Sequence, residues 1–223
     1  MGEVSNTPFR VELIRKAIHF CSLSIPVLYY SLSKLTALKI LIPLTAAFLL
    51  TDLLRYYHQP TARLFHTLFG WLLREHETDK ETKALNGATY MLISATICIL
   101  IFPKLIVITS FAVLIIADSA AALIGQQFGR HKIAFVRPRE KSVEGSVAFL
   151  VGAIAVVLLT PKVARLPGEY IIGIVAGFVG MLAEVFSSRI LDDNVAVPMA
   201  IGATLWLLYL LFFPDLNIYQ FDG

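Results

Sequence analysis

Apolar stretches recur along the chain at lengths that match the thickness of a lipid bilayer. A helix needs about 20 mainly apolar residues to cross the hydrocarbon core. The sequence holds runs that approach this length at roughly 17–33, 36–54, 87–102, 104–126, 144–160, 170–188 and 195–213. Prolines stand between or after several of these runs, where a helix ends readily. The pattern predicts an all-α fold, a polytopic membrane bundle of about seven transmembrane helices.

The composition agrees with a membrane protein and limits what else the chain holds. Hydrophobic residues make up 57% of the sequence and charged residues 16%, whereas soluble domains are usually about 45–50% apolar and about 25% charged. No polar stretch approaches the roughly 50 residues that a second domain needs. We therefore expect residues 1–223 to form a single integral membrane domain. The net charge of +3 is small, and we expect no nucleic-acid partner.

The segment from about residue 60 to residue 74 has a different character. Apolar side chains such as Leu64 and Trp71 gather mainly on one face of a helix, and Arg63 and Arg74 lie nearer the other face. This pattern is typical of an amphipathic helix that lies in the membrane interface, here on the cytoplasmic side. The alternative is an eighth, short transmembrane span.

Lysine and arginine are distributed unequally between the two ends of the predicted spans. Cytoplasmic loops of membrane proteins carry an excess of both residues. If the N-terminus lies inside, the basic residues that fall outside are Lys34, Lys39, Lys104, Lys162 and Arg165, out of 19 in the chain. The distribution therefore predicts a cytoplasmic N-terminus and an external C-terminus.

A first group of polar residues lies at the entry to the first span. Glu12, Arg15 and His19 share one face of a helix, with Lys16 at its edge. A solvated helix end with snorkelling basic side chains would give the same pattern. His19 lies deeper in the apolar run, which favours a functional role.

A second candidate is Asp118, which interrupts an apolar run. A carboxylate there is costly unless it has a partner, so it is a functional candidate. Small residues repeat every four positions around it and allow close approach of a helix or a ligand: Ala117, Ala121, Gly125 and Gly129. For this stripe alone, plain helix packing is the favoured interpretation, and Asp118 shifts the balance toward a site.

The loop after that span is strongly basic and leads into a glycine-containing helix start. Arg130 and Lys132 lie in the loop, and Lys141-Ser142 precedes Glu144 and Gly145 at the mouth of the fifth span. A basic loop often serves only as a topology signal or as a contact to lipid head groups. Helix N-terminal amides beside lysine and arginine also form a site suited to phosphates.

A further acidic group ends the sixth span and begins the seventh. Glu184 lies near the inner end of the sixth span, and Asp192, Asp193 and Asn194 follow it. With Asp118, these residues offer the hard oxygen ligands that Mg²⁺ prefers. Asp192, Asp193 or Asn194 can instead cap the seventh span. Basic residues, acids and glycines at one membrane face suggest a nucleotide–metal site beside a lipid substrate, facing the cytoplasm.

Several motifs, taken in order, resemble the CTP-dependent polyprenol and lipid kinase family, which includes dolichol kinase, phytol kinase and CTP-dependent diacylglycerol kinase. They are ELIRKAIHF (12–20), LLREHE (72–77) with LNGATY (85–90), IADSAAALIGQQFGRHKI (116–133), EKSVEGS (140–146) and DDNVAVP (192–198). The resemblance covers nearly the whole chain. It implies transfer of the γ-phosphoryl group of CTP, with Mg²⁺, to the hydroxyl of a membrane lipid alcohol. The acceptor can be of the polyprenol, phytol or dolichol type, or diacylglycerol.

The resemblance also implies roles for individual residues. The nucleotide- and phosphate-binding candidates are Gly125, Gly129, Arg130, Lys132, Lys141, Ser142, Glu144 and Gly145. The candidates for metal binding, or for orienting the bases or the hydroxyl, are Asp118, Glu184, Asp192, Asp193 and Asn194. The candidates on the substrate side are Arg15, Lys16, Arg74, Glu77 and Asn86. The catalytic candidates are Asp118 and Lys141, with Glu12 or His19 to position or deprotonate the lipid hydroxyl.

Two alternative functions belong to other classes. The stretch from Asp118 to Ser146 also resembles phosphatidate cytidylyltransferase, but the Pro-Gly-His-Gly-Gly run that follows in that family is absent from SSRILDDNVAVP. Intramembrane acids also mark transporters, although the sequence shows no internal repeat and its charges lie toward one face. The kinase interpretation is favoured, with CTP, a membrane lipid alcohol and the bilayer as partners. The sequence leaves open whether the chain forms a homodimer.

Overall fold

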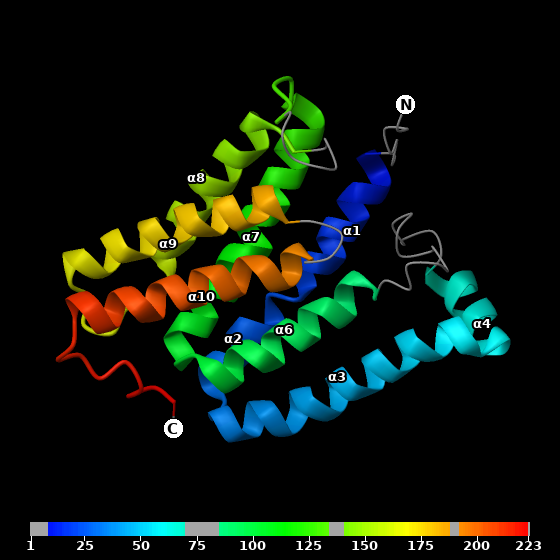
Figure 1. Ribbon diagram of the computed structural model, residues 1–223, viewed down its shortest axis with the longest axis horizontal. Coiled ribbons are helices and arrows are strands. Elements are labelled where there is room, and N and C mark those ends of the chain that lie inside the picture. The colour runs from blue at the N-terminus through cyan, green and yellow to red at the C-terminus, as the bar shows by residue number, and fades with distance from the viewer. Residues whose placement is uncertain (1–8, 70–84, 134–140, 188–191, 223) are drawn as a thin grey trace.

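The structure, a computed structural model, describes residues 9–69, 85–133, 141–187 and 192–222. The regular elements in these ranges are helices, with an isolated antiparallel bridge between Lys132 and Ser142. The helices are α1 (Phe9–Cys21), α2 (Ser24–Ser31), α3 (Lys34–Tyr57), α4 (Gln59–Phe69), α6 (Gly87–Ile101), α7 (Lys104–Phe128), α8 (Val143–Leu159), α9 (Pro167–Phe186) and α10 (Asp193–Phe212). Figure 1 shows an elongated bundle from which α4 projects. The predicted all-α class is confirmed.

The membrane character of the bundle rests on its longest helices. Within the described ranges, α3, α7, α9 and α10 are long and apolar enough to cross a membrane. The apolar helices α6 and α8 are shorter, with 15 and 17 residues, which gives rises of about 22–26 Å. Each of these helices coincides with a predicted span, so the predicted membrane helix bundle is confirmed.

The first predicted span, 17–33, is divided into α1 and α2 by a turn at Ser22 and Leu23. Pro26 explains the break, because proline has no N–H to donate to the carbonyl of Ser22 and its ring crowds that carbonyl. The carbonyl of Ser22 accepts the N–H of Ile25 instead, at 2.9 Å. The turn lets α1 and α2 both pack against α7.

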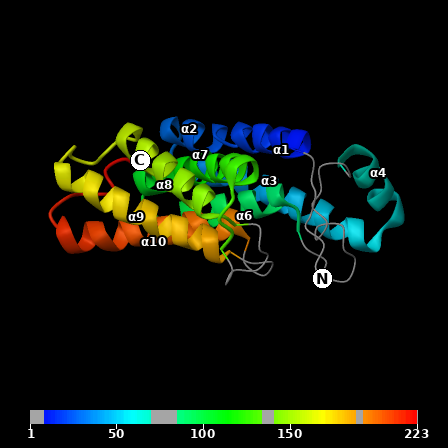
Figure 2. The same cartoon turned by 90° about the horizontal axis from the view of Figure 1, so that it is seen from above.

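The buried centre of the bundle is α7. Of the four long helices it is the most enclosed, with 78% of its apolar window inside the protein. It packs along α8 and lies between α1–α2 and α9–α10, as Figure 2 shows. Phe111, Leu114 and Ile115 on α7 are fully buried. A charged group in the buried part of this helix therefore needs a partner in the protein.

Apart from α4, the helices from α3 to α10 run in alternating directions, so their termini gather at two ends (Figure 1). We call one the site end: α1, α6, α8 and α10 begin there, and α3, α7 and α9 end there. The other is the far end, where α2, α6, α8 and α10 end and α3, α7 and α9 begin.

Helix α4 continues from the site end of α3 after a sharp bend and packs against it (Figure 1). The amphipathic helix predicted over residues 60–74 is present over Gln59–Phe69, and residues 70–74 lie outside the described residues. Leu64 is 62% exposed, as expected for a helix with an apolar face turned away from the bundle. Its place in the membrane interface stays a prediction.

We expect the N-terminus to lie in the cytoplasm and the C-terminus outside. The lysine and arginine asymmetry predicts it, and α1 begins at the opposite end of the bundle from the end of α10 (Figure 1). A reporter that is active only outside the cytoplasm should be active after Gly223 and inactive before Met1. A reporter that fluoresces only in the cytoplasm is the reciprocal control. Reporter results that place both termini on the same side of the membrane would contradict the prediction.

Candidate active site

Asp118 forms the centre of a polar cluster between α7 and α1 at the site end. The residue is 5% exposed. The ammonium group of Lys16 donates to its Oδ2 at 2.5 Å. Nε2 of His19 lies 3.7 Å from the same oxygen. Lys16 and His19 are three positions apart, so they point from one face of α1 toward α7. The partner that a buried aspartate requires is therefore supplied by α1.

This arrangement changes the interpretation of α1. The sequence pattern placed Lys16 at the edge of a face formed by Glu12, Arg15 and His19, whereas Lys16 is the residue that reaches Asp118 and is only 7% exposed. Arg15 is partly buried. The side chain of Glu12 lies outside the described residues, so its catalytic role stays a prediction.

A second ion pair joins the start of α8 to the end of α9. Lys141 donates to Glu184, whose side chain is 5% exposed, while the lysine side chain is 22% exposed. Burial by itself lowers the pKa of Lys141, but the carboxylates of Glu184, Asp193 and Asp118 outweigh it, so the pKa lies above its ordinary value. Lys141 therefore faces the acidic residues of α7, α9 and α10 and stays protonated.

The segment before α8 is tied to the end of α7. The N–H of Ile133 donates to the carbonyl of Lys141 at 3.0 Å, and the N–H of Val143 donates to the carbonyl of His131 at 2.9 Å. Glu144 accepts from the backbone and from the ring Nδ1 of His131. These contacts hold Lys141 directly before the first turn of α8. Arg130 and Lys132, the other predicted phosphate ligands, lie exposed in the segment that follows α7.

Ser142 and the predicted glycines pack α7 against α8. The side chain of Ser142 is buried and accepts from the N–H of Gly145 at 3.2 Å, so it caps α8. A Cβ on Gly145 would lie 2.9 Å from the carbonyl oxygen of Ala121. A Cβ on Gly125 or Gly129 would crowd the Ser142 hydroxyl. The small-residue stripe therefore serves helix packing on this face, and nucleotide contacts by these residues stay a prediction.

The start of α10 shows a helix cap. Oδ1 of Asp192 accepts from the backbone of Asn194 at 2.9 Å and from its side-chain amide at 2.7 Å. Asp192 therefore caps α10, which was one of the two roles predicted for it. The side chain of Asn194 donates to the same carboxylate. Asp193 lies within electrostatic reach of Lys141. Metal binding by these three residues stays a prediction.

The acidic residues suit a metal ion that is shared with phosphates. In the described part of the chain, no group of three or more His, Cys, Asp and Glu side chains could hold a metal ion by itself. Mg²⁺ usually takes one or two carboxylates and completes its shell with water and substrate phosphates. The carboxylates of Asp118 and Glu184 fit this donor chemistry.

Another polar cluster at the site end was missed by the sequence patterns. Asp52 on α3 is 0% exposed and pairs with Arg55. It also accepts the backbone N–H of Asn86 at 2.7 Å. Asn86, predicted on the substrate side, caps α6 through the N–H of Thr89. An aspartate three positions before an arginine in an apolar run was the available signal. Arg74 and Glu77 lie outside the described residues.

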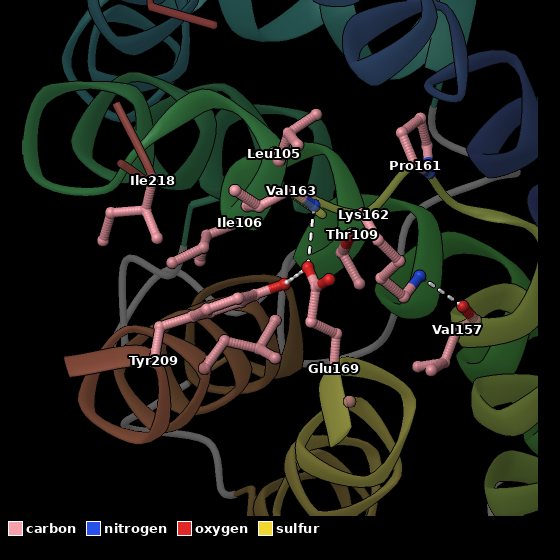
Figure 3. A pocket seen from close by; sticks show the side chains of 12 residues that line it. Leu105, Ile106, Thr109, Val157, Pro161, Lys162, Val163, Glu169, Tyr209 and Ile218 are labelled. Atoms are coloured by element: carbon pink, nitrogen blue, oxygen red, sulfur yellow. Dashed lines mark hydrogen bonds between the residues drawn. The ribbon is translucent and has the colours of Figure 1, made fainter. Parts of the chain in front are cut away.

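A small hollow lies at the far end, away from both ion pairs (Figure 3). Glu169 in its wall accepts the N–H groups of Val163, Ala164 and Leu166 and the hydroxyl of Tyr209, at 2.7–3.0 Å. Lys162 donates to the carbonyls of Val157 and Thr160 at the end of α8. These polar groups are engaged in holding the loop between α8 and α9, which is a structural role.

Comparisons with known proteins support the resemblance read from the motifs. The family model described as the cytidylyltransferase family matches residues 5–190. The CTP-dependent diacylglycerol kinase 1 of Schizosaccharomyces pombe is 28% identical over 170 residues, which cover 70% of this chain and 74% of that protein. The protein of the same name from Saccharomyces cerevisiae is 27% identical over 213 residues, or 84% of this chain and 70% of that protein. An uncharacterised protein of Rickettsia prowazekii is 27% identical over 194 residues, which cover 86% of this chain and 92% of that protein. No solved structure matches.

Proposed function

This chain belongs to the cytidylyltransferase family, and we propose on that premise that it is a CTP-dependent lipid kinase. The reaction is transfer of the γ-phosphoryl group of CTP to the hydroxyl of a membrane lipid alcohol. Three relatives named CTP-dependent diacylglycerol kinase 1 support a lipid acceptor and CTP as the donor. Diacylglycerol is the first acceptor to test, and isoprenoid alcohols are the second.

The observation that carries the proposal is the convergence of two lysine–carboxylate pairs at one end of an apolar bundle. Lys16 with Asp118 and Lys141 with Glu184 bring charges from α1, α7, α8 and α9 together. Phosphoryl transfer requires positioning and neutralisation of charge more than covalent chemistry. Cations for phosphate and carboxylates for a metal ion, gathered at one end of an apolar bundle, meet that requirement.

The nucleotide side of the site lies on α7, α8, α9 and α10. Lys141 stands directly before the first turn of α8, where backbone N–H groups and the helix dipole favour an anion. Arg130 and Lys132 add exposed positive charge in the segment that follows α7. When CTP binds, its phosphates would draw Lys141 from Glu184, and Mg²⁺ bound by Asp118 or Glu184 would neutralise phosphate charge.

The acceptor side includes α1. Leu13, Ile14 and Ile18 on its outer face are 42–52% exposed, which suits contact with lipid chains, whereas Lys16 and His19 point to Asp118. The hydroxyl oxygen of the lipid forms a bond to the γ-phosphorus, and the bond from that phosphorus to the β–γ bridging oxygen breaks, so CDP leaves. The hydroxyl proton passes to a base, and we assign this role to His19, whose Nε2 lies 3.7 Å from Oδ2 of Asp118.

The purified protein is expected to phosphorylate a lipid alcohol with CTP in preference to ATP and only with a divalent metal ion. CTP labelled in its γ-phosphate should transfer the label to lipid, and excess EDTA should stop the transfer. Equal or better activity with ATP would contradict the role of CTP. A lipid labelled only from α-labelled CTP, with release of pyrophosphate, would show a cytidylyltransferase instead.

A further inference from the structure

Asp52 and Arg55 form a buried charged pair in a helix that is otherwise mostly exposed. Only 17% of the apolar window of α3 is buried, yet Asp52 is 0% exposed and Arg55 6%. Nε of Arg55 lies 2.9 Å from Oδ1 of Asp52. Removing two charges from water is costly. The contacts that the pair makes with neighbouring helices give a reason for this cost.

The second oxygen of Asp52 holds the start of α6. Oδ2 accepts the backbone N–H of Asn86 at 2.7 Å. Oδ1 of Asn86 in turn accepts the N–H of Thr89 at 3.0 Å and caps the helix. A carboxylate on α3 thereby fixes the position of a residue 34 places further along the chain.

The guanidinium group of Arg55 holds α4. Its central carbon lies 4.8 Å from the centre of the Tyr56 ring and 4.9 Å from the centre of the Phe65 ring on α4. Nη2 also donates to the hydroxyl of Tyr56 at 2.9 Å. A planar guanidinium group is suited to such stacking, which a lysine cannot reproduce. The pair therefore joins α3, α4 and α6 at the site end.

We propose that the Asp52–Arg55 pair is a positioning element for the lipid acceptor, an inference that rests on the proposed function. The nucleotide groups lie on α7 to α10, whereas α3, α4 and α6 form the other side of the site end (Figure 1). Helix α4 exposes Leu64, and Tyr57 at the bend before it is 72% exposed. These apolar side chains suit an acceptor that arrives from the bilayer. Helix α6 packs on α10, whose first turn carries Asp193.

Asp52→Asn is the first test, with Glu169→Gln as the matched control. Both changes convert a buried carboxylate that accepts backbone N–H groups into an amide, at opposite ends of the bundle. We expect Asp52→Asn to raise the KM for the acceptor, measured as mole fraction in mixed micelles, about tenfold, because displaced positioning groups weaken catalysis steeply. The KM for CTP should stay within about twofold. Glu169→Gln should change neither value, although it should lower the unfolding temperature.

Hydrogen exchange at the start of α6 tests the geometry without activity. The backbone N–H of Asn86 should exchange faster in Asp52→Asn and remain slow in Glu169→Gln. Arg55→Lys keeps the charge but loses the stacking on α4, so it should raise the acceptor KM while Asn86 remains protected. Equal changes in the KM values for CTP and acceptor would overturn the positioning role. An unchanged exchange rate of the Asn86 N–H in Asp52→Asn would overturn it as well. A wild-type protein that phosphorylates no lipid would refute the proposed function, and the exchange data would still report on the pair.

Discussion

Asp118→Asn is expected to lower kcat about a hundredfold or more while the protein still inserts into membranes and purifies. The change preserves size and removes the charge that Lys16 and His19 face. Without that charge, Lys16 loses its ion-pair partner at the α1–α7 contact, and His19 loses the negative charge beside its ring. Preorganised charges contribute most in sites from which water is excluded, and Asp118 is 5% exposed. The measurement is kcat for phosphoryl transfer from CTP at saturating acceptor.

The matched control for Asp118→Asn is again Glu169→Gln. It removes the charge of a buried carboxylate at the far end that accepts loop N–H groups and the hydroxyl of Tyr209. We expect it to reduce stability but to leave kcat near that of the wild type. If Asp118→Asn keeps a normal kcat while Glu169→Gln abolishes turnover, the active site is at the far end and its assignment here is wrong.

The helices were predictable because the bilayer imposes a length and a polarity on each of them. The runs predicted at 104–126 and 195–213 correspond to α7 and α10, and they differ from these helices only at their ends. The break in the first run was not predicted, because the apolar stretch around Pro26 is continuous in the sequence. Its missing N–H ends the hydrogen-bonding pattern at Ser22, and α2 begins from a new turn.

The candidate site was predictable as a set of polar residues but not as a set of contacts. Charge in an apolar run identified Asp118 and Glu184, since each needs a partner. Which lysine each would contact depends on how α1 and α8 pack around α7, and helical spacing within one segment carries no such information. Asp52 was missed for a related reason. Its proximity to Arg55 was visible in the sequence, but its contact with Asn86 spans two helices.

Lys141→Met is expected to reduce kcat with CTP several hundredfold, which corresponds to a loss of about 3–4 kcal/mol of transition-state stabilisation. The ammonium group stands before the first turn of α8, where it and the backbone N–H groups would act together on a phosphate. Its pKa is raised above the ordinary value because the facing carboxylates of Glu184, Asp193 and Asp118 outweigh burial, which alone would lower it. The group is therefore cationic throughout the neutral range, and its titration should impose no loss of activity there.

Two further variants separate this loss of rate from a loss of folding. Lys141→Met leaves Glu184 buried without its lysine, so Lys141→Met/Glu184→Gln, which removes both charges, should recover the unfolding temperature but not kcat. Lys162→Met is the matched control, because Lys162 follows the other end of α8 and donates to the carbonyls of Val157 and Thr160. It should lower stability and leave kcat nearly unchanged. If the double variant regains near-normal kcat, Lys141 only balances the charge of Glu184 and does not act on the phosphates of CTP.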